Sequence, residues 1–319
     1  MLSNLTYSIN AVVPIFILVI LGYLLKQFRF ITEEFCEVSE RVVFKIALPV
    51  MLFLEVAKSS LDVIGDMRLI WFCLITVTAS FTVGAVLALL CIKDPARRGA
   101  FVQGACRSNF AILGVPLAEN MFGTVGTQMI AIVMPFVILM FNSYSVIILS
   151  VFSSDAEHRL NKKSIVGILK NIVTNPLIIG VVLGLPFMLL DWEMPVIMHK
   201  SLTYLNNLCT PLALMSLGAN FKPANMKGRV GYAVAASLCK TVILPGIMVT
   251  LAVLLGFRDA ALGVVLILFG APTAVSSYIM AKKMKNDGEL AAQILLLTTL
   301  LCIFTIFAGI FILKTLQFI

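Results

Sequence analysis

Polar and helix-breaking residues interrupt two long apolar runs of this sequence. The first interruption reads Arg107-Ser-Asn-Phe-Ala-Ile-Leu-Gly-Val-Pro116, and the second reads Phe269-Gly-Ala-Pro-Thr-Ala-Val-Ser-Ser277. Proline removes one backbone hydrogen bond and clashes with the preceding helical turn, so each stretch predicts a broken helix. The new helix N-termini would carry partial positive charge beside amide and hydroxyl side chains. This combination is typical of a site that binds an anion.

The side chains and turn residues of these two stretches are the candidate substrate-binding residues. Arg107 offers a permanently charged guanidinium that can hold a carboxylate through two parallel hydrogen bonds. Its alternative role is to cap free carbonyl groups at the end of the first half-helix. We expect Asn109 to donate a hydrogen bond to the same carboxylate, aided by backbone amides near the breaks. The other candidates are Gly114, Pro116, Pro272, Thr273, Ser276 and Ser277.

The composition indicates that lipid surrounds most of the chain. Of its 319 residues, 60% are hydrophobic and 13% are charged, and the mean hydropathy is +1.04. Soluble domains are about 45–50% apolar and about 25% charged, so the values exclude a soluble globular protein, a disordered chain and a disulfide-stapled module. The seven cysteines are scattered without a CxxC pair, and there are two histidines. We therefore expect no metal site and no cofactor.

Apolar runs separated by polar clusters predict an all-α integral membrane protein with ten transmembrane helices. The expected ranges are 5–26, 38–57, 68–92, 98–121, 125–152, 167–190, 197–220, 229–256, 259–283 and 288–315. A helix needs roughly 20 apolar residues to cross a bilayer, so ten spans leave room only for short loops. The longest polar interruption, residues 153–163, falls at the midpoint with five spans on each side.

An internal repeat relates the two halves. Shifting the second half back by 162 positions superimposes five proline or glycine pairs: Pro14 and Pro176, Gly22 and Gly184, Pro49 and Pro211, Gly84 and Gly246, and Gly126 and Gly288. Because each repeat has an odd number of spans, the second copy must be inverted in the membrane. We therefore expect two inverted five-helix repeats, 1–157 and 158–319, with the broken fourth and ninth helices crossing at the midplane. This organisation is the hallmark of secondary transporters.

The repeat also pairs polar positions outside the two broken helices. Lys45 corresponds to Asn207, which follows Asn206, and we expect these residues to face the crossing from the opposite side. The alternatives are that Lys45 extends to the membrane surface and that the asparagines make an interhelical hydrogen bond. Ionisable residues inside spans are costly and mark function.

Three ionisable residues are candidates for coupling transport to a proton or a cation. Lys240 lies midway along the eighth expected span, where it would pair with substrate or take the place of a coupling cation. A hydrogen bond to a backbone carbonyl is its structural alternative. Glu55 and Glu119 are acidic residues near the outer ends of spans.

The basic residues predict the orientation. Fifteen of the 24 Lys and Arg residues flank the odd-numbered loops, and five flank the even-numbered loops and the C-terminus. The positive-inside rule therefore places the odd loops in the cytoplasm and both termini outside the cytoplasm, in a multi-pass protein of the cell (inner) membrane. The same rule explains the net charge of +8 without a nucleic-acid partner.

Several motifs resemble the auxin efflux carrier family, the bacterial relatives of plant PIN transporters. Pro14-x7-Gly22 resembles the family's first span, and Val42-Val-Phe-Lys-Ile-Ala-Leu-Pro49 its second. Asn109-x4-Gly114-Val-Pro116 and Pro272-Thr-Ala-Val resemble its two crossing motifs, the first being the most specific. The resemblance covers essentially the whole chain. The long central loop of many plant members is missing, which favours a bacterial member.

The resemblance implies an inverted-repeat fold shared with bile-acid symporters and NhaA-type antiporters. In this fold, helices 1, 2, 6 and 7 form a scaffold, and helices 3–5 and 8–10 form a moving transport bundle. Family substrates are weak organic acids, namely indole-acetate in plants and malate or malonate in bacteria. The resemblance also suggests a homodimer through the scaffold helices.

We therefore predict a secondary active transporter of small organic anions that works by elevator-like alternating access. The alternatives are a membrane receptor or sensor on the same fold and an anion channel. We expect no enzyme, because the HExxH and GxSxG motifs are absent.

Overall fold

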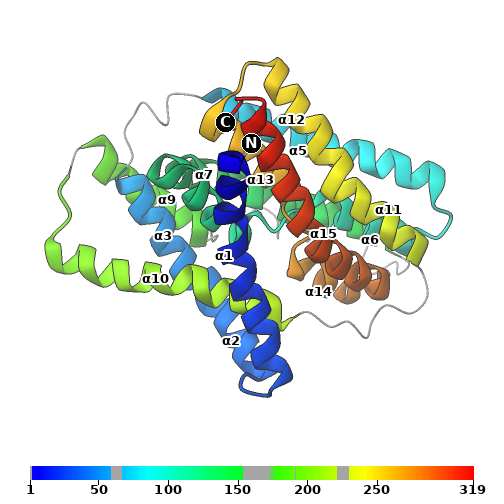
Figure 1. Ribbon diagram of the computed structural model, residues 1–319. Helices are drawn as coiled ribbons and strands as arrows, with labels where there is room; N and C mark the ends of the chain where they lie inside the picture. The colour runs from blue at the N-terminus through cyan, green and yellow to red at the C-terminus, as the bar shows by residue number, and fades with distance from the viewer. Residues whose placement is uncertain (1, 59–66, 154–173, 175, 191, 221–229) are drawn as a thin grey trace.

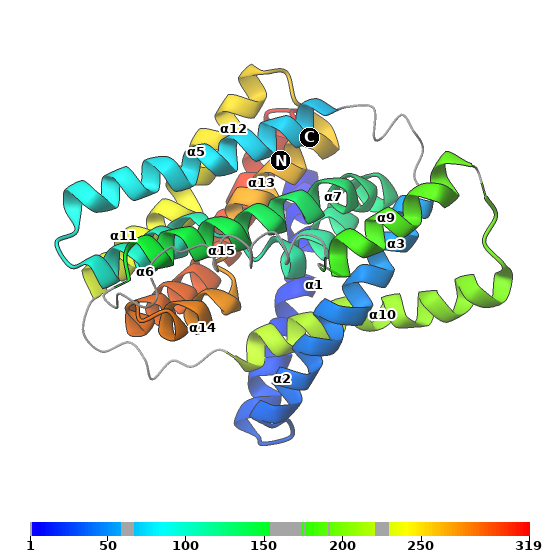
Figure 2. The same cartoon turned by 180° about the vertical axis from the view of Figure 1, so that it is seen from behind.

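The protein is a bundle of long helices that we describe from a computed structural model (Figures 1 and 2). The structure describes residues 2–58, 67–153, 174, 176–190, 192–220 and 230–319. Within these residues there is no β-strand. Six helical runs are long and apolar enough to cross a membrane: Ser3–Gln27, Met67–Cys91, Pro95–Val151, Val230–Leu254, Asp259–Lys282 and Gly288–Thr315. The protein is therefore an all-helical, multi-pass membrane protein.

The first half of the chain forms six α-helices and one π-helical segment within the described residues. They are α1 (Leu2–Gln27), α2 (Glu33–Val42), the π-helical segment η1 (Val43–Ala47), α3 (Leu48–Ala57), α5 (Met67–Cys91), α6 (Pro95–Cys106) and α7 (Phe110–Val151). The helices of the second half are α9 (Pro176–Leu189), α10 (Val196–Ala219), α11 (Val230–Leu238), the π-helical segment η4 (Cys239–Ile243), α12 (Leu244–Leu254), α13 (Asp259–Gly270), α14 (Val275–Lys283) and α15 (Gly288–Thr315).

Each of the ten expected ranges contains helix where the structure describes it, but some boundaries differ. Helix α2 begins at Glu33, five residues before the expected start at 38. Thr32 caps it by accepting a hydrogen bond from the Phe35 amide, and acidic residues in the first turn complement the helix dipole. Helix α7 covers both the end of the fourth expected span and the whole of the fifth. The two parts meet at Gly123, whose φ of 58° and ψ of −140° break the helical geometry.

Two π-helical turns each precede a proline. In η1 the Leu48 amide donates to the Val43 carbonyl five residues back, and in η4 the Leu244 amide donates to Cys239 in the same way. The next residue is a proline in both cases, which has no N–H to continue the usual pattern. Both turns carry a lysine. Such local bulges are frequent at functional sites.

The helices form two packed groups. Helices α1, α2, α3, α9 and α10 lie together on one side in both views, and α5, α6 and α11 to α15 lie together on the other. Helix α7 packs against members of both groups, and α1 of the first group also packs against α15 of the second. The two chain ends lie close together, since the Asn4 amide donates to the Thr315 hydroxyl at 3.4 Å. Both ends therefore lie on the same side of the molecule.

Candidate functional site

Two helix breaks meet in the middle of the protein. Residues Arg107–Asn109 separate α6 from α7, and residues 271–274 separate α13 from α14. The Asn109 backbone N–H donates to the Pro272 carbonyl at 2.7 Å, and the Thr273 hydroxyl donates to the Gly104 carbonyl at 2.6 Å. The two interrupted helices therefore contact each other at their breaks.

The local sequence explains the second break better than the first. A residue before proline avoids helical geometry, and Ala271, which precedes Pro272, has φ −62° and ψ 147°. The first break is shorter than the expected stretch, because helix resumes at Phe110. Gly114 and Pro116 consequently lie inside α7 and not in unwound backbone, which corrects that part of the prediction.

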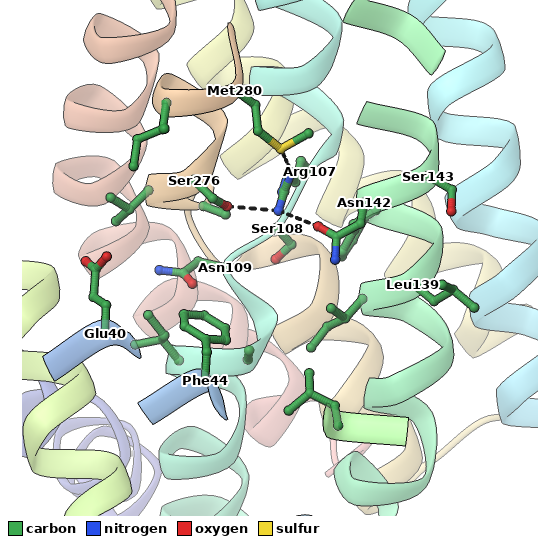
Figure 3. Close-up of a pocket in the computed structure, with 18 of the residues that line it drawn as sticks. Glu40, Phe44, Arg107, Ser108, Asn109, Leu139, Asn142, Ser143, Ser276 and Met280 are labelled. Atoms are coloured by element: carbon green, nitrogen blue, oxygen red, sulfur yellow. Dashed lines mark hydrogen bonds between the residues drawn. The ribbon is translucent and has the colours of Figure 1, made fainter. Parts of the chain in front are cut away.

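A cavity of about 540 Å³ opens beside the two breaks (Figure 3). Its wall comes from α2 and η1, from α7 and α9, and from the start of α14. The polar residues that line it are Glu40, Lys45, Arg107, Ser108, Asn109, Asn142, Ser143, Thr174 and Ser276. The rest of the wall is largely apolar, with Phe44, Ile138 and Ile279 among its members. A mostly apolar pocket with a few convergent polar groups is typical of a small-molecule site.

Arg107 is buried beside this cavity without an acidic partner. Its side chain is 7% exposed, and Figure 3 shows it between Asn142 and Ser276. One terminal nitrogen donates to the Ser145 hydroxyl at 3.2 Å and to the Met280 sulfur at 2.9 Å. The other donates to the Asn142 amide oxygen and to the Ser276 hydroxyl, both at 2.8 Å. All four acceptors are neutral, and no ion pair of Arg107 occurs within the described residues. A buried charge of this kind calls for a counter-charge.

Further groups that favour an anion surround the cavity. The side-chain amide nitrogen of Asn109 and the Ser108 hydroxyl are buried without a hydrogen-bond partner in the described part of the chain. Helices α7 and α14 both begin here, and no side chain caps either N-terminus. The positive ends of two helix dipoles therefore reach the cavity.

Comparison with known proteins gives the family. A family model described as "Membrane transport protein" matches residues 7–308. The chain belongs to this family. It is the family of the auxin efflux carriers, so the resemblance read from the sequence is confirmed.

The relatives of this chain carry different names. The chain is 26% identical over 296 residues to an "Uncharacterized transporter" of Methanothermobacter thermautotrophicus, covering 92% of this chain and 94% of the relative. It is 24% identical over 306 residues to a "Putative malonate transporter" of Rhizobium meliloti, covering 92% of each chain. It is also 28% identical over 225 residues to a mouse "Lysosomal cholesterol signaling protein", covering 67% of this chain and 26% of that protein.

The structure of this membrane transport protein brings some of the expected residues together. Arg107, Asn109, Ser276 and Lys45 line the cavity. The Arg107 guanidinium donates to side chains and not to the carbonyls of α6, so it does not cap that half-helix.

Pro272 and Thr273 lie at the contact between the breaks without lining the cavity. Thr273 is buried, and its backbone N–H donates to the Thr298 hydroxyl of α15 at 3.2 Å. Ser277 is buried in the first turn of α14, and it does not line the cavity.

Other expected residues lie away from the cavity. Gly114 and Pro116 are buried within α7, and Asn206 and Asn207 lie on α10, where Asn207 is exposed. None of these four residues lines the cavity.

The three coupling candidates also lie outside the cavity. Lys240 is fully buried, and its ammonium group donates to the Phe269 carbonyl at 2.6 Å, in the last turn of α13. Glu55 accepts a hydrogen bond from the Thr127 hydroxyl at 2.9 Å, and Glu119 is exposed. Lys240 thus neutralises part of the negative end of the α13 dipole.

The sequence prediction missed five polar residues that line the cavity, among them Glu40 and Asn142. Glu40 lies within the expected 38–57 span, and Asn142 lies in the apolar run 125–152. The signal was present in both cases, because a polar side chain inside an apolar run is the feature that singled out Lys45 and Lys240.

Proposed function

We propose that the protein is a secondary transporter of small organic anions, whose carboxylate binds at the two helix breaks. The observation that carries this proposal is Arg107, a buried guanidinium that lines a cavity and has only neutral partners in the described residues. A substrate carboxylate would supply the missing counter-charge.

The binding mode follows from the groups around Arg107. The carboxylate takes the place of the Ser276 hydroxyl as an acceptor, and that hydroxyl then turns to donate to it, since a serine side chain can do both. The unpartnered amide nitrogen of Asn109 donates a second hydrogen bond. The apolar wall around Phe44 and Ile138 accommodates the rest of a small acid. Malonate is the first compound to test, because one relative carries it in its name.

The proposed architecture has two inverted five-helix repeats, 1–157 and 158–319. The group of α1, α2, α3, α9 and α10 serves as the scaffold, and α5, α6 and α7 together with α11 to α15 serve as the moving bundle. The grouping of these helices on two sides of the molecule in Figures 1 and 2 supports this division. In an elevator-like step, the bundle carries the two breaks past the scaffold and exposes the cavity to the other side.

The proposed orientation places the odd-numbered loops in the cytoplasm and both termini outside, in the cell membrane. The close approach of the two chain ends supports a common side for them. A homodimer through the scaffold and coupling to protons or a cation remain parts of the proposal that family resemblance suggests.

Exchange across a membrane tests the proposal. Purified protein is reconstituted into liposomes loaded with unlabelled malonate, malate or indole-acetate, and uptake of the labelled acid is measured. We expect saturable counterflow of at least one acid. Asn109→Ala should reduce this counterflow at least tenfold while the protein stays folded and inserted, because the carboxylate loses a buried donor.

Asn10→Ala is the matched control, because Asn10 is an exposed asparagine of α1 that does not line the cavity. It should exchange like the wild type. Undiminished exchange by Asn109→Ala would refute the central site. Binding of acids without exchange would indicate a receptor, and flux without saturation would indicate a channel.

A further inference from the structure

Three charged side chains line the cavity in the described part of the chain, and they differ in sign. Arg107 and Lys45 are basic, and Glu40 is acidic. Arg107 is buried, whereas Lys45 is exposed, so water screens Lys45 more strongly. Glu40 is half-buried in the wall across from the helix breaks. In Figure 3 the side-chain nitrogen of Asn109 points towards the side of the cavity where Glu40 lies.

Glu40 is held in place by a neutral group. Its carboxylate accepts a hydrogen bond from the Asn220 amide at 2.6 Å, which links α2 to the end of α10. No ion pair of Glu40 with a basic residue occurs among the residues described, so its charge is not cancelled by a neighbour there. The other acidic residues of its own helix, Glu33, Glu34 and Glu37, are exposed.

These positions make the cavity selective by charge. One negative charge on a ligand pairs with Arg107. A second negative charge on a small ligand would face the Glu40 carboxylate across the same cavity, with Lys45 compensating only partly because it is solvated. At an effective dielectric constant of about 20, repulsion between two like charges in such a cavity lowers the affinity for the dianion, relative to the monoanion, by on the order of tenfold or more.

We propose that Glu40 makes this transporter selective for monoanions, so that the substrate is a monocarboxylate or a dicarboxylate with one carboxyl group protonated. The inference rests on the proposed function, because it assumes that a carboxylate binds at Arg107. Glu40 acts here on the ligand itself and not through another residue.

Two acids of nearly equal size test the inference. Malonate is a dianion at neutral pH, and its monoamide, malonamate, is a monoanion of the same length. Their dissociation constants are measured by calorimetry on the purified protein in detergent. We expect the wild type to bind malonamate at least about tenfold more tightly than malonate. Malonate should bind more tightly as the pH falls towards the range where it becomes a monoanion.

Glu40→Gln keeps the acceptor for Asn220 and removes the charge. We expect it to tighten malonate binding about tenfold while malonamate changes much less, so that the preference shrinks or reverses. Glu37→Gln is the matched control, because this exposed glutamate lies one turn before Glu40 on α2 and does not line the cavity. It should leave both constants unchanged.

Three outcomes would overturn the inference. The first is tighter binding of malonate than of malonamate by the wild type. This measurement needs no variant, so it tests the inference even if Glu40→Gln does not fold. The second is a Glu40→Gln protein with the wild-type ratio of the two constants. The third is equal weakening of both ligands in Glu40→Gln, which would indicate a structural role at the α2–α10 contact. Failure of the proposed function is distinguishable, because then no carboxylate would bind or exchange in the wild type.

Discussion

Gly22 of α1 lies directly on the backbone of Met215 in α10. A Cβ at Gly22 would be 2.1 Å from the Met215 carbonyl oxygen. The same kind of contact joins Gly184 of α9 to Phe53 of α3, where the corresponding distance is 2.9 Å. The offset of 162 positions that relates the two glycines also relates Phe53 to Met215. The two glycine contacts are therefore equivalent under the repeat, with the halves of the chain exchanged. This equivalence supports the proposed internal repeat independently of the sequence pattern.

Gly22→Ala should destabilise the protein. Any side chain at this position meets the backbone of α10, which cannot move aside as a side chain could, so the two helices must separate. We expect a loss of about 1–3 kcal/mol, measured as a lower thermal unfolding midpoint of the purified protein.

Gly246→Ala is the control for this substitution. Gly246 lies in α12, and a Cβ there has no atom within 4 Å. The change should be neutral or slightly stabilising, because alanine favours helix over glycine. Equal effects of the two substitutions would contradict the close backbone contact.

The sequence predicted those features that depend on residue type at a fixed position. Proline before an unwound turn located the break at Pro272, and the glycines of the repeat marked close helix contacts. Asn109 was placed at the site because it lies between an arginine and a glycine–proline motif in a span. Local chemistry was sufficient in these cases.

The sequence could not predict which face of a helix meets the cavity. In a soluble helix, apolar periodicity identifies the buried face, but a helix in lipid is apolar on both its buried and its exposed sides. Asn207 and Lys45 therefore looked equivalent, although α10 turns Asn207 outward and η1 brings Lys45 to the cavity. Helix packing, which sequence alone does not give, decides this.

Arg107→Gln should weaken the binding of carboxylates, and of dianions most. Glutamine removes the buried positive charge and two of the donors that hold Asn142 and Ser276 in place. We expect about a tenfold to hundredfold loss of affinity for a dicarboxylate, measured by the ligand-induced rise in thermal stability.

Arg98→Gln is the comparison for Arg107→Gln. Arg98 lies near the start of α6, where it donates to the Ile92 carbonyl at 2.6 Å, and it does not line the cavity. Its substitution should leave ligand-induced stabilisation as in the wild type. If Arg107→Gln binds carboxylates normally, the guanidinium is not the anion partner.

Thr273→Val tests the contact between the two breaks. The Thr273 hydroxyl donates to the Gly104 carbonyl of α6 at 2.6 Å in a fully buried position. Valine has nearly the same shape but leaves that carbonyl unsatisfied, so we expect a loss of about 1–3 kcal/mol in thermal unfolding. Thr250→Val is the control, since its hydroxyl bonds within its own exposed helix turn. A smaller loss at Thr273 than at Thr250 would argue against a structural role of the crossing.

Lys240→Met should separate function from stability. The Lys240 ammonium is fully buried and donates to the Phe269 carbonyl. A buried charge without an acidic partner is costly, so a methionine of similar volume should leave the unfolding midpoint within a few degrees of the wild type or raise it. Transport should nevertheless fall at least tenfold. The positive charge offsets the negative end of α13 just before the second break, and its loss would make that region less favourable for an anion.

Counterflow and thermal unfolding measured on the same preparation decide between the roles of Lys240. Lys200→Met, an exposed position in the first turn of α10, should change neither quantity. A Lys240→Met protein that unfolds early would show that the lysine is there for the fold. A stable Lys240→Met protein with full exchange would remove Lys240 from the transport mechanism, because the anion would then need only the charge of Arg107.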